Sequence, residues 1–195
     1  MLLTLMRHGL PVRDDGDRRD PGLSAEGFAQ ARMVVPYARV REFDTVYASP
    51  QLRAAQTAGV VAEGLGLPVR VDEGLAEFDY GSDYMHYDNP DDDRWQRYRA
   101  GDLSPWGLTG VEFCGRIVAA MERLAQSHPG GRVLAVCHGG VVNAWTCQVL
   151  GVPDRLRMFE PGYASMHHFA RSGANWDLRG LNEVVHGLPP AIQLV

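Results

Sequence analysis

The chain has 195 residues, 45% hydrophobic and 22% charged, a composition that suits one domain with a buried core. A formal net charge of −5 argues against a broad basic surface, so we expect no nucleic-acid partner. There is no run of the roughly 20 apolar residues that span a bilayer, no room for a signal peptide before Arg7 and no CxxC pair among the cysteines, so we expect a cytoplasmic protein without a membrane partner.

Short apolar runs alternate with amphipathic segments along the chain. The runs predicted as strands cover residues 2–6, 43–48, 69–71, 132–137, 164–170 and 176–181. The segments predicted as helices cover about 24–39, 50–65, 109–128 and 141–150. This alternation predicts an α/β fold, a three-layer α/β/α sandwich with a mostly parallel central sheet, and the last two runs predict an antiparallel edge strand. We expect one domain over residues 1–195.

Three helix starts carry capping signals. Ser24 precedes the first helical segment as a candidate N-cap. The serine and proline at 49–50 predict a second start, with Ser49 capping the amides and Arg53 in the first turn. Thr109 and Glu112 have the spacing of a capping box.

Two histidines, His8 and His138, each end a predicted strand and each precede a glycine. Because ligands bind at the carboxyl edge of open α/β sheets, we expect both at one site. Arg7 adjoins the first histidine, Arg53 begins a helix, and the helix after Gly139 directs backbone amides toward that edge. Each residue alone is compatible with an ordinary surface or backbone-bonded role. Together they predict a site for a tetrahedral oxyanion, most simply phosphate.

The sequence resembles the histidine phosphatase superfamily, which includes the cofactor-dependent phosphoglycerate mutases. The matching segments are 7–9 (RHG), 23–27 (LSAEG), 48–58 (ASPQLRAAQTA), 75–77 (LAE) and 136–141 (VCHGGV). They follow the family order over nearly the whole chain. The resemblance implies a phosphoglycerate mutase-like fold and a small phosphatase that needs no cofactor and no metal.

The resemblance also implies a role for each site residue. His8 is expected to be the nucleophile and to form a phosphohistidine, with Glu77 as the proton donor. Glu77 needs a pKa raised toward neutrality for that role, and without the resemblance it ranks no higher than neighbouring carboxylates. The residues expected to bind the phosphoryl group are Arg7, Gly9, Arg53, His138 and Gly139. Among these, the two arginines and His138 are expected to be catalytic, because they offset charge on the phosphoryl oxygens.

Some segments depart from the family pattern. Residues 10–12 (LPV) replace the glutamate and hydroxyl residue that are common there, Asn143 stands where an arginine is frequent, and 83–85 (DYM) replaces a Trp-Glu-Gly. The acidic, aromatic segment 79–109 has two readings. It is compatible with a lid over the leaving group, and equally with a solvated loop whose aromatic side chains pack on the domain.

Other functions fit the same motifs. A phosphoglycerate mutase carries extra basic residues between the acid and the second histidine, whereas here that interval begins acidic. A catalytically silent regulator that binds phosphorylated ligands remains an alternative, although all five expected catalytic residues are present. The acidic run 88–93 lacks calcium-loop spacing, and adjacent His167 and His168 face opposite sides of a strand, so we expect no metal site. The expected partner is a small phosphorylated metabolite, and a homodimer is compatible with the sequence.

Overall fold

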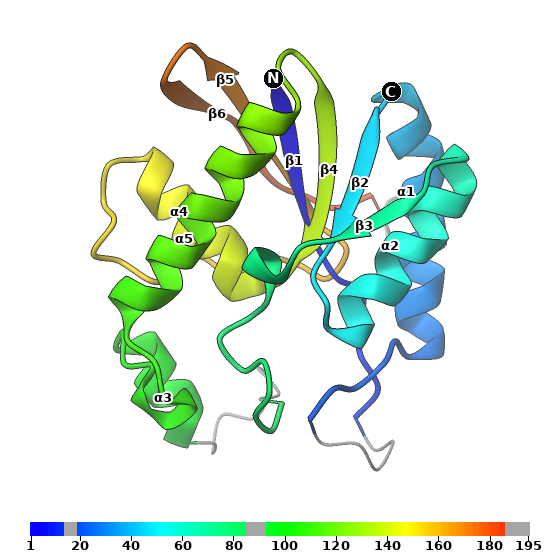
Figure 1. The fold of residues 1–195 in the computed structure, drawn as a ribbon. Coiled ribbons are helices and arrows are strands. Elements are labelled where there is room, and N and C mark those ends of the chain that lie inside the picture. Colours follow the sequence, from blue (N-terminus) through cyan, green and yellow to red (C-terminus); the bar gives the residue numbers. More distant parts are fainter. Residues whose placement is uncertain (14–18, 85–92, 186–195) are drawn as a thin grey trace.

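The computed structural model describes residues 1–13, 19–84 and 93–185. A six-stranded sheet lies at its centre (Figure 1). The strands are β1 Leu2–Arg7, β2 Thr45–Ala48, β3 Val69–Val71, β4 Arg132–Cys137, β5 Met166–Ser172 and β6 Asn175–Glu183. Their order is β3-β2-β4-β1-β5-β6; the first four are mutually parallel, and β5 runs antiparallel to both β1 and β6. The predicted mostly parallel sheet with an antiparallel edge is confirmed.

Helices cover both faces of the sheet (Figure 1). They are α1 Ala25–Val40, α2 Leu52–Leu65, α3 Asp93–Arg99, α4 Gly110–Ser127 and α5 Gly139–Val149. Alternate β1 side chains face opposite layers, because Leu3 and Leu5 pack with α4 and α5, whereas Met6 packs with α1 and α2. The predicted three-layer sandwich is therefore confirmed. In the described part of the chain, no helix has the length and apolarity needed to cross a membrane.

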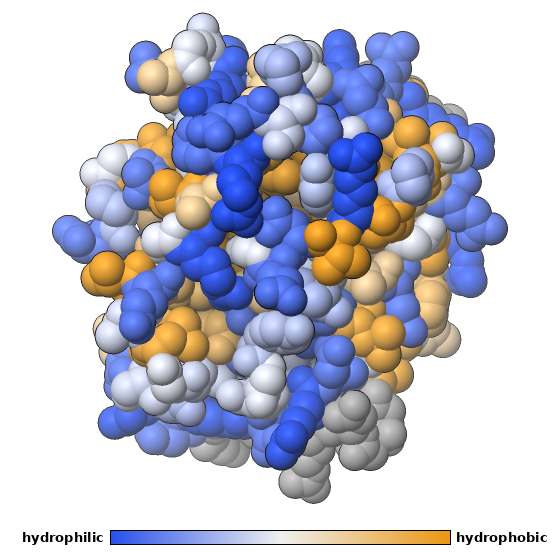
Figure 2. Space-filling model, viewed as in Figure 1, coloured by the Kyte–Doolittle hydropathy of each residue, from blue (hydrophilic) through white to orange (hydrophobic). Residues whose placement is uncertain are grey.

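The surface on the side shown in Figure 1 carries both hydrophobic and hydrophilic residues. Figure 2 shows several small groups of hydrophobic residues interspersed among hydrophilic ones on that face. Isolated apolar side chains are normal on a protein surface. This face therefore gives no indication of an extended apolar interface.

Two predicted caps are confirmed and one is wrong. The Gly27 amide donates to Ser24 Oγ at 3.0 Å, and Thr109 and Glu112 form the reciprocal capping box of α4. Ser49 does not cap α2, which begins at Leu52 after an N-cap residue whose side chain makes no capping bond. Instead the Leu52 amide donates to the carboxylate oxygens of Asp20, at 2.9 and 3.0 Å. Ser49 is engaged elsewhere, as the site shows.

Segment 79–109, interpreted from the sequence as a lid or a solvated loop, is not entirely loop, because it contains α3. The helix is short, has Asp93 in its first turn and basic residues in its last, and buries Trp95 and Tyr98 on one face. Phe78 stacks on Tyr98 with ring centroids 4.7 Å apart and meets Trp106 edge-on at 4.6 Å. These aromatic side chains are therefore part of the core. The role of 79–109 as a lid stays a prediction.

The structure shifts the start of one predicted helix and does not describe part of the predicted acidic run. The last helix begins at Gly139, two residues earlier than predicted, because His138 already occupies the N-cap position. Residues 88–92 of the predicted acidic run lie outside the described residues.

Removal of the α4 cap should weaken the fold without touching the site. Thr109→Ala leaves the Glu112 amide without its side-chain acceptor, so we expect the free energy of unfolding to fall by about 1 kcal/mol. Urea unfolding followed by circular dichroism measures the change. Thr109→Ser keeps the hydroxyl and should stay near the wild type; an equal loss in both variants would contradict the assignment.

Candidate active site

The two predicted histidines meet at the carboxyl edge of the sheet. His8 follows β1 and His138 follows β4, and these strands are parallel neighbours. The two rings lie with their centroids 5.2 Å apart, and both side chains are almost completely buried. Arg7 and Arg53 are buried as well. In Figure 1 this edge is at the lower ends of the strands.

The His8 ring is held in one tautomer. Nδ1 lies 2.7 Å from the carbonyl oxygen of Gly9, and because a carbonyl only accepts, Nδ1 carries the proton and Nε2 keeps its lone pair. Burial, followed by the charges of Arg53 and Arg7, lowers the pKa of His8 well below 6.5. His8 is therefore a neutral imidazole at neutral pH, with Nε2 able to act as a nucleophile.

Gly9 fixes the loop that carries His8. Its amide donates to Thr57 Oγ1 at 3.1 Å, so this N–H points to α2. A Cβ on Gly9 would lie 2.6 Å from the backbone oxygen of Gly27 in α1, so only glycine allows this close approach. The structure thus places Gly9 beside His8, and the contact of Gly9 with substrate stays a prediction.

His138 is oriented by Ser49. Ser49 Oγ accepts from the Gln51 amide at 3.3 Å and lies 2.7 Å from His138 Nε2. When Ser49 donates its proton to Nε2, the other ring nitrogen of His138, Nδ1, carries a proton and is a donor. Within the described residues, buried Nδ1 has no hydrogen-bond partner. Burial, with Arg53 next in effect, lowers the pKa of His138 well below 6.5, so this donor is neutral.

Each buried guanidinium has a carboxylate and a tyrosine against it. Arg53 Nη2 donates to Asp79 at 3.0 Å, and its guanidinium carbon lies 4.5 Å from the centroid of the Tyr84 ring. Arg7 Nη1 donates to Glu160 at 3.1 Å and also to the Pro161 carbonyl. The guanidinium carbon of Arg7 lies 4.1 Å from the centroid of the Tyr163 ring. Both arginines are thereby fixed in orientation beside the histidines.

Glu77 is buried against the start of α5. Its two carboxylate oxygens accept from the amides of Gly140 at 2.7 Å and Phe78 at 3.1 Å. Burial, followed by the neighbouring charge of Asp79, raises the pKa of Glu77 from 4.5 to about 7. A Cβ on Gly140 would come within 2.3 Å of Glu77 Oε1, so this arrangement requires glycine. Gly139, the next predicted site residue, lies against the Arg7 guanidinium.

The neighbouring carboxylates behave differently from Glu77. Asp72 accepts from the Gly74 amide at 2.8 Å and from Arg123 at 2.9 Å, and Glu73 is exposed. Burial at the histidine edge therefore distinguishes Glu77 from Asp72 and Glu73, which its sequence neighbourhood alone did not indicate.

Sequence reasoning missed the residues that connect the parts of the site. Gln51 donates from Nε2 to Asp79 at 2.8 Å and accepts at Oε1 from the Glu77 amide at 2.7 Å. Gln51 therefore connects the ion pair of Arg53 and Asp79 to the backbone of Glu77. Ser49 and Gln51 lie in the matched segment 48–58, which was the available signal. Asp79 was grouped with solvated carboxylates, yet it is buried beside Arg53.

Asn143 organises a loop where relatives often have an arginine. Its Nδ2 donates to the Gly139 and Phe159 carbonyls, both at 3.0 Å. Its Oδ1 accepts from the amides of Met158 at 2.8 Å and Phe159 at 3.2 Å. The segment that supplies Glu160 to Arg7 is thereby attached to α5.

The two adjacent histidines of β5 have different partners. His167 Nε2 lies 3.0 Å from Ser165 Oγ, whereas His168 lies 2.9 Å from both Thr4 Oγ1 and Glu183 Oε2. They therefore do not converge on a shared point. In the ranges 1–13, 19–84 and 93–185, no group of three metal-ligating side chains occurs.

Comparison with known proteins identifies the family. The family model for the histidine phosphatase superfamily (branch 1) matches residues 3–184. This chain belongs to the histidine phosphatase superfamily. An uncharacterized phosphatase PhoE of Bacillus subtilis is 28% identical over 184 residues, covering 91% of this chain and 92% of the relative. A probable phosphoglycerate mutase GpmB of Enterobacter sp. is 31% identical over 170 residues, 79% of each chain.

A solved structure supports the same assignment. The mycobacterial glucosyl-3-phosphoglycerate phosphatase in complex with VO3 has a TM-score of 0.76 and 25% identity, covering 93% of this chain and 99% of that one. The phosphoglycerate mutase-like fold is confirmed, and the protein is a phosphatase of the histidine phosphatase type.

A side chain at position 140 should displace the buried Glu77 carboxylate and lower the activity of this histidine phosphatase. Gly140→Ala forces the Glu77 carboxylate away from the α5 amide, so we expect phosphate release from an alkyl phosphate to fall at least about tenfold. A steady-state phosphate assay measures it. Gly59→Ala in α2 is the matched control, since its added methyl meets no atom within 4 Å. Equal activity of both variants would contradict this role of Gly140.

Proposed function

We propose that this phosphatase hydrolyses a small phosphorylated metabolite through a phosphohistidine on His8, with Glu77 as the proton donor. The observation that carries the proposal is the neutral His8 ring, whose Nε2 keeps a lone pair beside two buried guanidiniums. A nucleophile of this kind needs no deprotonation step before it attacks phosphorus. Glu77, with a pKa raised to about 7, is available as an acid at neutral pH.

The first half-reaction transfers the phosphoryl group to the enzyme. His8 Nε2 attacks phosphorus in line with the ester oxygen, the P–O bond breaks, and the departing alkoxide takes the proton of Glu77. Arg7, Arg53 and the Nδ1–H of His138 bind the phosphoryl oxygens and stabilise their charge in the transition state. The alcohol leaves, and His8 carries the phosphoryl group.

The second half-reaction returns the enzyme to its starting state. Glu77, now ionised, takes a proton from water as the water oxygen attacks phosphorus. The P–N bond breaks, and His8 regains its neutral ring. Its Nδ1–H still donates to the Gly9 carbonyl. Protons and charge balance over the two steps with these side chains alone.

Variants of the nucleophile and the acid should fail differently. We expect His8→Ala to abolish both turnover and the formation of the acid-labile phosphoprotein, because the variant lacks the proposed nucleophile. Glu77→Gln should lower kcat/KM for an alkyl phosphate by about 10²-fold or more, and much less for p-nitrophenyl phosphate, whose leaving group needs little protonation. Rapid quench into alkaline detergent, in which phosphohistidine is stable, and an assay of phosphate release measure both effects.

A matched carboxylate controls for a general charge effect. Glu73→Gln neutralises an exposed residue four positions before the acid and should leave both rates near the wild type. Wild-type turnover by His8→Ala would overturn the proposal, as would an equal loss for both esters in Glu77→Gln.

The proton donor predicts a pH dependence. Glu77 is protonated below its pKa of about 7, so kcat/KM for an alkyl phosphate should fall as the pH rises through 7. The ratio of wild-type to Glu77→Gln kcat/KM removes the titration of the substrate itself. This ratio should decline above pH 7; a ratio that stays level from pH 6 to 9 would rule out Glu77 as the donor.

A further inference from the structure

A cavity of about 260 Å³ lies at the edge of the sheet opposite the active site. It is lined by residues 2–4 of β1 and 168–170 of β5, by Phe43, and by Arg41, Arg132 and Arg179. Since a strand rises roughly 3.3 Å per residue, the two ends of β1 are about 17 Å apart. In Figure 1 this is the upper edge, where the start of β1 is marked N. The cavity is therefore separate from the histidine edge.

The cavity lies between the sheet and the connection that follows α1. That helix ends at Val40, and the chain reaches β2 through Arg41 and Phe43. On the sheet side, Leu2 is paired with Ala170 and Thr4 with His168. Both walls of the cavity are thus fixed by secondary structure.

The floor of the cavity is buried and satisfied within the protein. Thr4 is 5% exposed, and His168 and Ala170 are 8% exposed. Thr4 Oγ1 lies 2.9 Å from His168 Nδ1, and Nε2 of the same ring lies 2.9 Å from Glu183 Oε2. The polar atoms of the floor therefore already have partners, which leaves Leu2, Ala170 and the Phe43 ring to offer apolar contact.

The rim carries positive charge without a carboxylate among the lining residues. Arg41 Nη2 lies 3.3 Å from Glu183, and Arg179 Nη2 lies 3.1 Å from Asp177, so two of the three guanidiniums are paired. Arg132 Nη1 donates only to a backbone carbonyl, that of Arg41, at 3.2 Å. Within residues 1–13, 19–84 and 93–185, no carboxylate forms an ion pair with Arg132. One positive charge of the rim is thus uncompensated.

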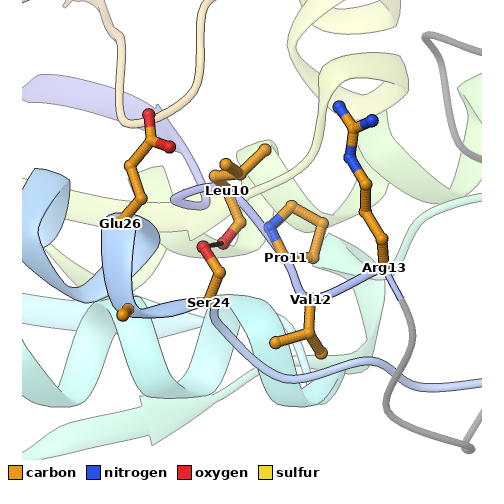
Figure 3. Close-up of a pocket in the computed structure, with 7 residues that line it drawn as sticks. Leu10, Pro11, Val12, Arg13, Ser24 and Glu26 are labelled. Atoms are coloured by element: carbon orange, nitrogen blue, oxygen red, sulfur yellow. Dashed lines mark hydrogen bonds between the residues drawn. The ribbon is translucent and has the colours of Figure 1, made fainter.

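A second cavity shows the contrast. Figure 3 shows the cavity lined by residues 10–13 and 24–26, where Arg13 and Glu26 carry opposite charges. An acidic and a basic side chain in one lining favour no particular sign of ligand charge. The lining beside Arg132 is unbalanced, because all its formal charges are positive.

The size of the cavity limits what it can hold. A volume of 260 Å³ equals the liquid volume of about nine water molecules. A ligand of about ten non-hydrogen atoms fits this space. One uncompensated guanidinium matches a single negative charge, and the planar fork of arginine matches a carboxylate.

We propose that this cavity is a second binding site, separate from the active site, for a small monocarboxylate with an apolar body. The carboxylate pairs with Arg132 at the rim, and the apolar body lies against Leu2, Phe43 and Ala170. The proposal does not depend on the chemistry at His8.

Three probe compounds test the two halves of this recognition. The probe is 4-fluorobenzoate, titrated into the full chain and followed by fluorine NMR. We expect 4-fluorobenzyl alcohol, which has the same ring without the charge, to bind at least about tenfold more weakly. Acetate, which has the charge without the ring, should compete at least about tenfold more weakly because it buries little apolar surface.

Amide NMR locates the bound probe. Titration of 4-fluorobenzoate into nitrogen-15-labelled protein should shift the amides of residues 2–4 and 168–170 most. The amides of residues 7–9 and 138–140 report on the active site, whose buried cations also attract anions. Largest shifts at 7–9 and 138–140 would overturn the proposal.

Variants of exposed residues test the contacts without disturbing the core. Leu2 is 44% exposed, and Leu2→Glu places a carboxylate at the cavity, whereas Leu2→Gln has the same shape without the charge. We expect Leu2→Glu to bind 4-fluorobenzoate about tenfold more weakly than Leu2→Gln, because like charges repel. Arg132→Gln should weaken binding about tenfold or more.

A matched arginine controls for the change in net charge. Arg32 is exposed on α1 and lies over the Phe28 ring, and Arg32→Gln should keep the wild-type affinity. Far-ultraviolet circular dichroism confirms that each variant is folded.

Several outcomes would overturn the site. They are an absence of saturation by about 10 mM 4-fluorobenzoate, equal affinity for the benzoate and the alcohol, and equal affinity for the benzoate and acetate. Wild-type affinity in both Arg132→Gln and Leu2→Glu would do the same, as would an equal loss in Arg32→Gln and Arg132→Gln.

Discussion

Two guanidiniums buried at one sheet edge are the constraint on which the rest of the site depends. Arg7 and Arg53 are almost fully buried, and removing an ion from water costs several kcal/mol unless other groups compensate it. Asp79 and Glu160 supply opposite charge, and the tyrosine rings supply polarisable faces. The same positive charges, added to burial, keep both histidines neutral. This edge of the sheet therefore combines fixed cations with two uncharged imidazole rings.

The same constraint separates the roles of two adjacent carboxyl groups. Asp79 is ion-paired with Arg53 and bonded by Gln51, so it is compensated as an anion. Glu77 accepts from two backbone amides and lies near the charge of Asp79, and burial has the largest effect, so its pKa rises to about 7. Unequal environments of this kind assign an acid and a counter-ion to two groups that look alike in the sequence.

The sequence predicted features that depend on local order along the chain. Strand ends followed by histidine and glycine placed His8 and His138 correctly, because parallel strands bring their carboxyl ends together. Glu77 could be singled out only by the family resemblance, since it is buried against Gly140, which is far away in the chain. Ser49 was predicted as a helix cap from the local Ser-Pro pattern. In the structure its hydroxyl faces His138, which follows another strand.

Helix α3 and Asn143 mark the limit of pattern reasoning. Seven residues give too few turns for a periodic signal, and α3 is held mainly by Trp95 and Tyr98 in the core. Asn143 departs from the family pattern, which suggested only the loss of a basic group. Its four bonds to backbone become visible only when the loop before β5 is placed against α5.

The central pairing of β1 with β4 has a kinetic consequence. Residues 2–7 at one end of the chain pair with residues 132–137, and β5 then closes on the other side of β1. Contacts so distant in sequence form late, because the loop between them must first lose its conformational freedom. During synthesis β1 therefore emerges long before β4, the strand with which it pairs. A chain that has not yet reached β4 carries His8 without the strand that brings His138 beside it.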